Sequence, residues 1–186
     1  MESQRMKKWI TGSVVVFIVA VLLGAKYLGF FAPPLSSVVQ QPIQRIALVD
    51  LAGNQHTFDE LKGKQPVVYF FTSWCAPCYK TLTTIEEVSN KNELNTDLVA
   101  VALDNNLDEV ARMVAKTGFN GTVWIAAEGE RALQQRYFGN EKRAVPYIVK
   151  LDENTNIVEG IYTLDSPAQW QAVLVAGIAL SAAKQK

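Results

Sequence analysis

Short apolar runs alternate with polar turns along most of this 186-residue chain. Apolar runs bounded by Gly, Pro, Asn or Asp predict strands, and apolar positions at helical spacing predict helices. The pattern predicts strands at residues 46–51, 66–72, 97–103, 122–126, 145–151 and 157–162. It predicts helices at residues 76–90, 107–116 and 128–138, and a helical turn at residues 58–61. Strands that alternate with helices indicate an α/β sandwich around a mixed sheet.

A last helix is predicted to begin at Ser166 and Pro167, because Ser caps helix ends well and Pro suits the first helical position. Apolar residues then recur at helical spacing: Trp170, Val173, Leu174, Gly177 and Ile178. The largely apolar stretch at residues 172–183 is too short to cross a bilayer, which takes about 20 residues. We therefore expect this helix to cover the core rather than to contact a membrane.

The first 31 residues follow a different pattern. Arg5, Lys7 and Lys8 precede an apolar stretch at residues 9–31, in which Lys26 is the only charged residue. As a helix rising about 1.5 Å per residue, this stretch would span roughly 34 Å, enough for the roughly 30 Å core of a bilayer. Basic residues mark the cytoplasmic end of such segments, so the sequence predicts a cytoplasmic N-terminus at residues 1–8 and an external remainder.

Two other interpretations of this segment are a cleaved signal peptide and a buried helix of a soluble protein. Cleavage favours small residues at the last and third-last positions. Leu23 and Phe30 hold the third-last position before the two candidate sites, Ala25 and Ala32. A buried helix is disfavoured because residues 14–23 show no polar face. An uncleaved transmembrane anchor is therefore the favoured interpretation.

Beyond the anchor, a Pro-containing linker at residues 32–42 leads to a globular domain at residues 43–186. The chain has 18 Lys plus Arg and 18 Asp plus Glu, so its charge favours neither nucleic acid nor an anionic surface as a partner. Two cysteines are too few for a disulfide-stapled scaffold. The single histidine, His56, follows a Gly-Asn turn and is expected at the surface.

The two cysteines stand where a predicted strand meets a predicted helix. Cys75 and Cys78 follow the apolar run at residues 67–71, with Ala76 and Pro77 between them. Disulfide exchange needs a thiolate, and the unpaired N–H groups and dipole of a helix start favour one on Cys75. Cys78 would lie about one turn along the helix, close enough to attack a mixed disulfide on Cys75.

This pair could also bind zinc or form a purely structural disulfide. A structural zinc site takes four ligands, and the chain offers two Cys and one His. A disulfide across two residues closes too short a loop to stabilise the fold much. A redox role is therefore favoured, and no metal is expected.

Residues 63–78, ending in Trp74-Cys75-Ala76-Pro77-Cys78, resemble the thioredoxin superfamily. They are most similar to its membrane-anchored TlpA/DsbE-type (CcmG/ResA-like) branch, and the resemblance runs from about residue 43 to the C-terminus. It implies a thioredoxin-like fold, with a mixed central sheet flanked by helices and one N-terminal transmembrane helix. It also implies that Cys75 attacks and Cys78 resolves, with no cofactor.

The resemblance further implies a cis-proline facing the dithiol, which Pro146 would supply. The backbone of Val145 would then pair with an extended substrate segment, and Trp74 would complete the substrate contacts. The alternative is a trans-proline at the start of an edge strand.

Two positions depart from the family pattern. Tyr69 stands where thioredoxins have a buried Asp, and Thr81 stands where some anchored members have a Glu. The proton acceptor for Cys78 is therefore open. Asp104 is one candidate, because it ends a strand expected to run parallel to the one before Cys75. The other interpretations are that Asp104 only caps a strand end and that water accepts the proton.

The sequence thus predicts a thiol:disulfide oxidoreductase anchored in the inner (cytoplasmic) membrane, with its catalytic domain in the periplasm or on the outer face. The resemblance favours a reductase of oxidised proteins, with apocytochrome c as one candidate substrate. A membrane dithiol carrier of the DsbD/CcdA kind would donate the electrons. Two alternatives are an oxidase or isomerase that uses the same cysteines, and a non-catalytic binding module.

Overall fold

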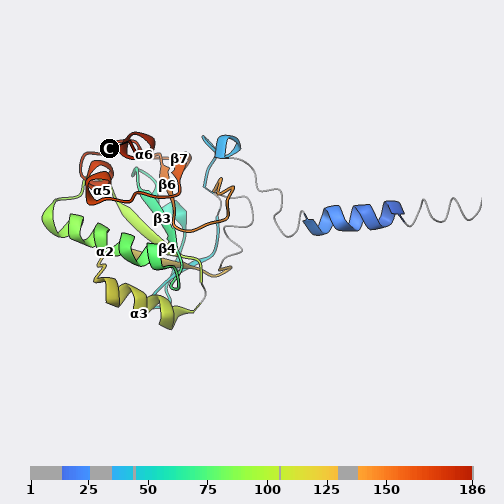
Figure 1. Ribbon diagram of the computed structural model, residues 1–186, viewed down its shortest axis with the longest axis horizontal. Coiled ribbons are helices and arrows are strands. Elements are labelled where there is room, and N and C mark those ends of the chain that lie inside the picture. The colour runs from blue at the N-terminus through green and yellow to red at the C-terminus, as the bar shows by residue number, and fades with distance from the viewer. Residues whose placement is uncertain (1–13, 26–34, 44, 105, 130–137, 186) are drawn as a thin grey trace, which may run out of the picture.

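The computed structural model describes residues 14–25, 35–43, 45–104, 106–129 and 138–185. Within these ranges the chain forms one sheet in the order β2-β1-β5-β4-β3-β6-β7. Strands β3, β4, β6 and β7 of this sheet are labelled in Figure 1. The strands are β1 (Leu48–Asp50), β2 (Gln55–His56), β3 (Val67–Phe71), β4 (Leu98–Ala102), β5 (Thr122–Ala126), β6 (Tyr147–Leu151) and β7 (Ile157–Ile161). The helices that follow them are α2 (Ala76–Lys91), α3 (Leu107–Thr117), α5 (Pro167–Leu174) and α6 (Leu180–Ala183), with 3-10 turns η1 (Leu35–Ser37) and η2 (Phe58–Leu61).

The sheet is mixed, as the strand–helix pattern predicts. Strands β3, β4 and β5 run parallel, whereas β1 is antiparallel to β5 and β6 is antiparallel to β3. Strand β7 returns beside β6 as a hairpin partner. Strand β2 is the one described strand that the sequence pattern did not predict, because its two residues are too few to show a period.

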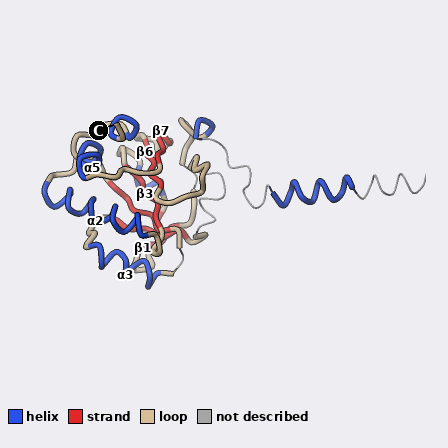
Figure 2. Tube along the Cα trace, viewed as in Figure 1, coloured by secondary structure: helices blue, strands red, loops and turns tan. Residues whose placement is uncertain are grey.

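Each face of the sheet has its own core. Val67, Tyr69 and Phe71 of β3 pack with α2, α3, α5 and α6 on one face, where these helices lie in Figure 2. Val68 and Phe70 point to the other face, where η2 and the segment before β1 cover them. All five β3 side chains are fully buried, which explains why this strand is apolar without alternation.

Local sequence signals set the helix ends. The side chain of Asn106 accepts a hydrogen bond from the Glu109 N–H at the start of α3, and Gly118 ends that helix in the left-handed conformation. Ser166 and Gln169 form a capping box at the start of α5. These ends agree with the predicted ones within a residue or two. Most of the helix predicted at residues 128–138 lies outside the described residues.

The last predicted helix is wrong in one respect, because it is two helices and not one. Helix α5 ends at Leu174, and Gly177 adopts a positive φ of 65° before α6 begins. The Leu174 carbonyl accepts hydrogen bonds from the N–H groups of Asn95 and Thr96, so the loop before β4 satisfies the helix end. Both helices still bury their apolar side chains in the core, as predicted.

Residues 14–25 form a helix whose apolar side chains are mostly exposed. Among the described residues, none of the helices combines the length and apolar character that crossing a membrane requires. The rest of the predicted anchor, residues 9–13 and 26–31, lies outside the described residues, as do residues 1–8.

Candidate active site

The two cysteines lie at the carboxyl end of the central strand β3. A turn closed by the Cys75 N–H donating to the Thr72 carbonyl, at 3.2 Å, leads from β3 into helix α2. Cys75 is the N-cap of α2, and Pro77 occupies its first turn, where a missing N–H costs no helical hydrogen bond. The sequence thus folds here into the strand–turn–helix that its pattern predicts.

Cys75 and Cys78 are joined by a disulfide, with their Cα atoms 5.2 Å apart. The Cys78 N–H also donates a hydrogen bond to the Cys75 sulfur at 3.2 Å. Cys78 is completely buried, whereas Cys75 keeps 5% of its surface exposed. In the reduced protein, this N–H and the positive end of the α2 dipole would stabilise a thiolate on Cys75.

Trp74 stands beside this disulfide with 66% of its surface exposed. A large aromatic side chain left in solvent next to a reactive group is suited to contact a partner. The substrate contact predicted for Trp74 stays a prediction.

The Val145–Pro146 peptide bond is cis, as predicted. Strand β6 pairs antiparallel with β3, with Tyr147 opposite Phe70. Continuing this register places Pro146 opposite Phe71, at the same end of β3 as the dithiol. Pro146 is buried and Val145 is half-buried.

Asn140, which the sequence did not single out, fixes the loop that leads to Val145 and Pro146. Asn140 is 3% exposed, and its side chain bonds the backbone of Ala144 twice. The Asn140 amide donates to the Ala144 carbonyl at 2.8 Å and its oxygen accepts from the Ala144 N–H at 3.2 Å. An Asn shortly before a Pro is a usable signal for such a loop, because Asn side chains often bond nearby backbone in turns.

Asp104 lies at the edge where the parallel-strand argument expects it. Strand β4 runs parallel to β3 and pairs with it up to Ala102. The residue after Ala102, Leu103, donates its N–H to the Phe71 carbonyl at 2.9 Å. One Asp104 oxygen accepts a hydrogen bond from the Ser73 N–H at 2.8 Å, two residues before Cys75. The other oxygen, Oδ1, is buried and has no hydrogen-bond partner among the described residues. Asp104 therefore holds the turn before the dithiol and keeps one acceptor unused.

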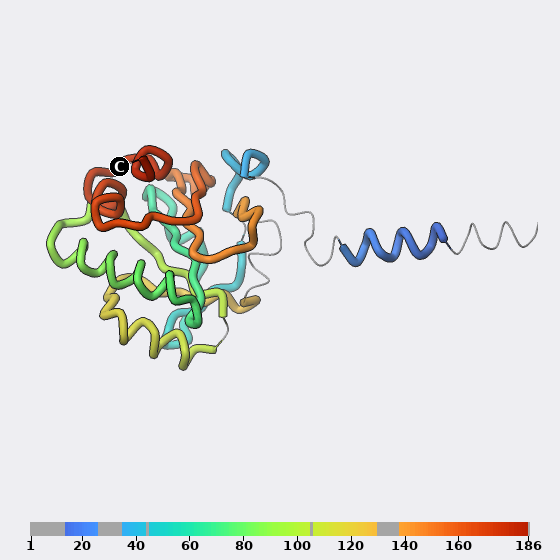
Figure 3. The backbone as a smooth tube through the Cα atoms, in the orientation of Figure 1, coloured from blue at the N-terminus to red at the C-terminus, as the bar shows by residue number. Residues whose placement is uncertain are grey.

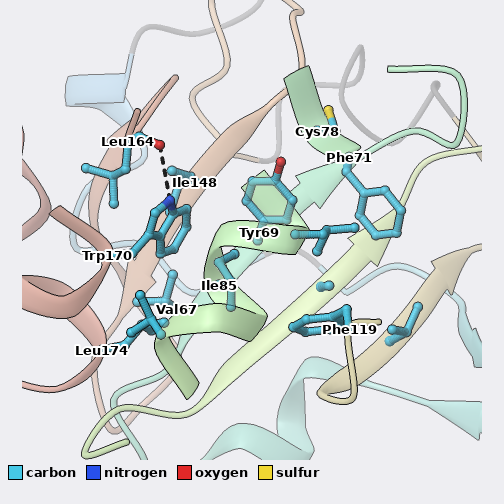
Figure 4. Packing of buried hydrophobic residues seen from close by; sticks show 14 of the residues in the cluster. Val67, Tyr69, Phe71, Cys78, Ile85, Phe119, Ile148, Leu164, Trp170 and Leu174 are labelled. Carbon is cyan, nitrogen blue, oxygen red and sulfur yellow. Dashed lines mark hydrogen bonds between the residues drawn. The ribbon is translucent and has the colours of Figure 1, made fainter. Parts of the chain in front are cut away.

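Tyr69 and Thr81, the two positions that depart from the family pattern, approach each other beneath α2. Figure 4 shows Tyr69 in the same core as Cys78, between Phe71 and Trp170. Burial raises the pKa of the Tyr69 hydroxyl, so this group stays protonated and cannot act as a base. Thr81 lies close enough to oppose this pKa shift, although no hydrogen bond of good geometry joins the two hydroxyls.

Three buried side-chain oxygens of the described residues lack a hydrogen-bond partner: Tyr69 Oη, Thr72 Oγ1 and Asp104 Oδ1. All three belong to β3, to β4 or to the residues that directly follow these strands. Unpaired buried polar atoms are rare in folded proteins, so each one calls for an explanation such as a catalytic role or an ordered water. Thr72 was not among the residues that the sequence singled out, and no spacing or composition signal distinguishes it.

A mixed α/β sheet with a disulfide at the start of the helix that follows its central strand defines the thioredoxin-like class of disulfide-exchange proteins. The chain belongs to the Redoxin family, whose profile matches residues 38–173.

Among the curated relatives, the chain is 26% identical over 164 residues to the thiol-disulfide oxidoreductase ResA of Bacillus thuringiensis, covering 86% of this chain and 92% of ResA. Among solved structures, it resembles a thioredoxin-family thiol:disulfide interchange protein from Chlorobium tepidum, with a TM-score of 0.54 at 22% identity. That match covers 77% of this chain and 95% of the other. A secreted Mycobacterium tuberculosis disulfide oxidoreductase homologous to E. coli DsbE gives 0.51 at 19% identity, covering 64% and 84%.

These matches confirm the resemblance to the TlpA/DsbE/ResA type and the thioredoxin-like fold. The chain is a thiol-disulfide oxidoreductase.

Proposed function

We propose that this protein reduces disulfides of protein substrates, with Cys75 as the attacking sulfur and Cys78 as the resolving one. The observation that carries the assignment is the difference in access between the two sulfurs. Cys75 keeps some exposure at the helix start beside the exposed Trp74, whereas Cys78 is fully buried behind it. Only Cys75 can be approached by a disulfide on another protein.

The reaction balances in two exchanges. The Cys75 thiolate attacks one sulfur of the substrate disulfide, forms a mixed disulfide and releases the first substrate thiolate. Cys78 then loses its proton and attacks the Cys75 sulfur, which releases the second substrate thiolate and leaves the Cys75–Cys78 disulfide. Two electrons thus pass from the dithiol to the substrate.

The proton of Cys78 needs an acceptor in this scheme. We assign it to the unpaired oxygen of Asp104, either directly or through water, because among the described residues this carboxylate bonds the turn before Cys75. Trp74, Val145 and Pro146 would contact the substrate chain.

The reductase direction, the donor and the location complete the proposal. The DsbE-type resemblance supports reduction, with electrons supplied by a membrane dithiol carrier of the DsbD/CcdA kind. The apolar stretch at residues 9–31 and the basic residues before it support an anchored domain on the periplasmic or outer face of the inner membrane. Oxidised proteins, with apocytochrome c as one candidate, would be the substrates.

Substrate trapping tests the chemistry. Cys78→Ala should accumulate mixed disulfides on Cys75 that reductant releases, because the resolving sulfur is gone. The double variant Cys75→Ser/Cys78→Ala is the matched control and should trap nothing. If Cys78→Ala forms no adduct, the exchange mechanism is wrong. That result would support the alternative that the protein is a non-catalytic binding module.

The redox state in cells tests the direction. Alkylation of free thiols in rapidly acidified cells should find the pair mostly reduced, and a mostly oxidised pair would indicate an oxidase instead. Protease added to intact spheroplasts should digest residues 43–186 if the domain lies outside the cytoplasm, and full protection of the domain would contradict the proposed location.

A further inference from the structure

A groove opens beside Trp74 on the side of the dithiol that faces α3. It has a volume of about 920 Å³ and lies between the start of α2 and one flank of α3, two helices that run side by side in Figure 3. Trp74 and Tyr79 line it from the dithiol side, and Arg112, Met113 and Lys116 line it from α3. The groove thus continues the surface around Cys75 toward a helix that the exchange chemistry does not use.

Both sides of the groove are fixed by the fold. Glu109, Arg112, Met113 and Lys116 are spaced i, i+3, i+4 and i+7, so they share one flank of α3. The Tyr79 hydroxyl donates a hydrogen bond to the Lys116 carbonyl at 3.1 Å, which ties α2 to the last turn of α3. The groove is therefore formed before any partner arrives.

The groove offers exposed aromatic surface. Trp74 is 66% exposed and Tyr79 is 38% exposed, and both belong to the few large apolar side chains of the globular domain that remain in solvent. Aromatic surface of this kind contacts aromatic or aliphatic side chains of a partner.

The groove also carries an unbalanced positive charge. The Glu109 carboxylate pairs only loosely with Arg112, because its Oε1 lies 3.9 Å from the Arg112 Nη2. Within the described part of the chain, no carboxylate lies within ion-pair distance of the Lys116 ammonium. A carboxylate of a bound partner would therefore find a cation with no competing acidic partner.

We propose that this groove binds the segment of the substrate polypeptide that flanks its target cysteine, and that it selects a segment with an acidic side chain next to an aromatic or aliphatic one. The apolar side chain would pack on Trp74 and Tyr79 while the carboxylate pairs with Lys116. This inference rests on the proposed function, because it takes the occupant to be a disulfide substrate that Cys75 attacks.

The test uses two short peptides that contain one phenylalanine and one cysteine, the latter blocked as a mixed disulfide with thionitrobenzoate. The peptides differ only in carrying Asp or Lys beside the phenylalanine. Each is mixed with the reduced protein in a single turnover, and release of the coloured thionitrobenzoate gives the second-order rate constant. At low ionic strength the wild type should react about fivefold faster with the Asp peptide, the size expected for an exposed ion pair.

Lys116→Glu should abolish or reverse this preference. Lys91→Glu is the matched control, because Lys91 occupies the last turn of α2 as Lys116 does that of α3, yet lies outside the groove. The control should keep the preference. Each variant is compared with itself on two peptides, so partial unfolding would lower both rates alike and leave the ratio unchanged.

The outcomes separate the two proposals. Equal rates of the wild type with both peptides, or an unchanged preference in Lys116→Glu, would overturn the groove assignment while the exchange chemistry stands. No release from either peptide by the wild type would overturn the proposed function, and this inference with it.

Discussion

At the corner formed by β1, β2 and η2, the side chains of Asp50, His56 and Glu60 all have hydrogen-bond partners. The Asp50 carboxylate accepts hydrogen bonds from the N–H groups of Ala52 and Asn54 and from the Asn54 amide, at 2.8–2.9 Å. His56 lies between Asp50 and Glu60, and its ring stacks on Trp124 with centroids 5.1 Å apart. We call these residues the β1–β2 corner.

The dithiol end, which comprises Tyr69, Thr72, Cys75, Cys78 and Asp104, is built in the opposite way. Its polar atoms are deeper, yet three of its side-chain oxygens make no hydrogen bond with the described residues. An unpaired buried polar atom costs stability, whereas a fully bonded turn adds to it. The difference indicates that the corner serves the fold, whereas the dithiol end leaves the Asp104 Oδ1 atom able to accept a hydrogen bond or a proton.

The largest expected effect is that of Cys75→Ser. This change should abolish reduction of a disulfide-bonded test protein such as insulin, because a hydroxyl cannot form the mixed disulfide. Asp50→Ala at the β1–β2 corner is the comparison variant and should retain turnover at a temperature where it stays folded. The turbidity that develops as insulin is reduced measures the turnover of both variants. Residual turnover by Cys75→Ser would place the attacking sulfur elsewhere.

Asp104→Asn should have the second-largest effect on turnover. The amide keeps an oxygen that can accept the Ser73 N–H, but it cannot take a proton from Cys78, so turnover should fall by about tenfold or more. The pH profile of turnover should also change, because hydroxide would have to replace the carboxylate as base. A structural role alone would leave the shape of that profile unaltered, and this outcome would remove Asp104 from the mechanism.

The sequence predicts where the residues of the dithiol end lie, but it does not predict which of their buried oxygens lack a hydrogen bond. The apolar run of β3, the cysteine spacing and the helix start place Cys75 and Cys78, and the parallel alternation of strands brings Asp104 to the same edge. Periodicity reports which side chains are buried, but it does not report whether a buried oxygen finds a donor. That is why Thr72 was missed and why the nearness of Tyr69 to Thr81 appears only in the fold.

The β1–β2 corner was predicted less well for a related reason. The sequence predicts His56 at the surface, whereas it is partly covered, stacked on Trp124 and bonded to Glu60. Trp124 comes from β5, far along the chain, and nothing in local sequence indicates that β1 would pair beside it. The split between α5 and α6 has a similar origin, because the loop at Asn95 and Thr96 supplies the donors that end α5.

Tyr69→Phe tests whether the unpaired Tyr69 hydroxyl at the dithiol end lowers the free energy of unfolding. Removing a buried hydroxyl without a hydrogen bond should raise the unfolding free energy by about 1 kcal/mol, and the ring contacts with Phe71 and Trp170 are kept. Urea unfolding of the oxidised protein measures this change. Tyr147→Phe is the matched control and should lower the stability, because the Tyr147 hydroxyl donates to the Phe138 carbonyl at 2.7 Å. Equal effects of the two changes would contradict the contrast between paired and unpaired hydroxyls.

The smallest expected effect is a pH dependence of stability at the β1–β2 corner. Hydrogen bonds to Glu60 and then Asp50 raise the pKa of His56, and hydrogen bonding led by Asn54 lowers the pKa of Asp50 to about 2. A raised folded-state pKa favours the charged imidazole, so its stabilisation is complete below the unfolded-state pKa of about 6.5 and is lost as the pH rises through the folded-state value. The carboxylates stay ionised across this range.

His56→Phe isolates the charge, because a phenyl ring can still stack on Trp124. The difference in unfolding free energy between wild type and variant should be largest near pH 5.5 and should shrink by pH 8.5, as urea titrations at the two pH values would measure. The same comparison made with Tyr69→Phe should show no such pH dependence, because the Tyr69 phenol keeps its proton throughout. If the His56→Phe difference instead grew with pH, the imidazole would be neutral in the folded protein and the ion pairs of the corner would not stabilise it.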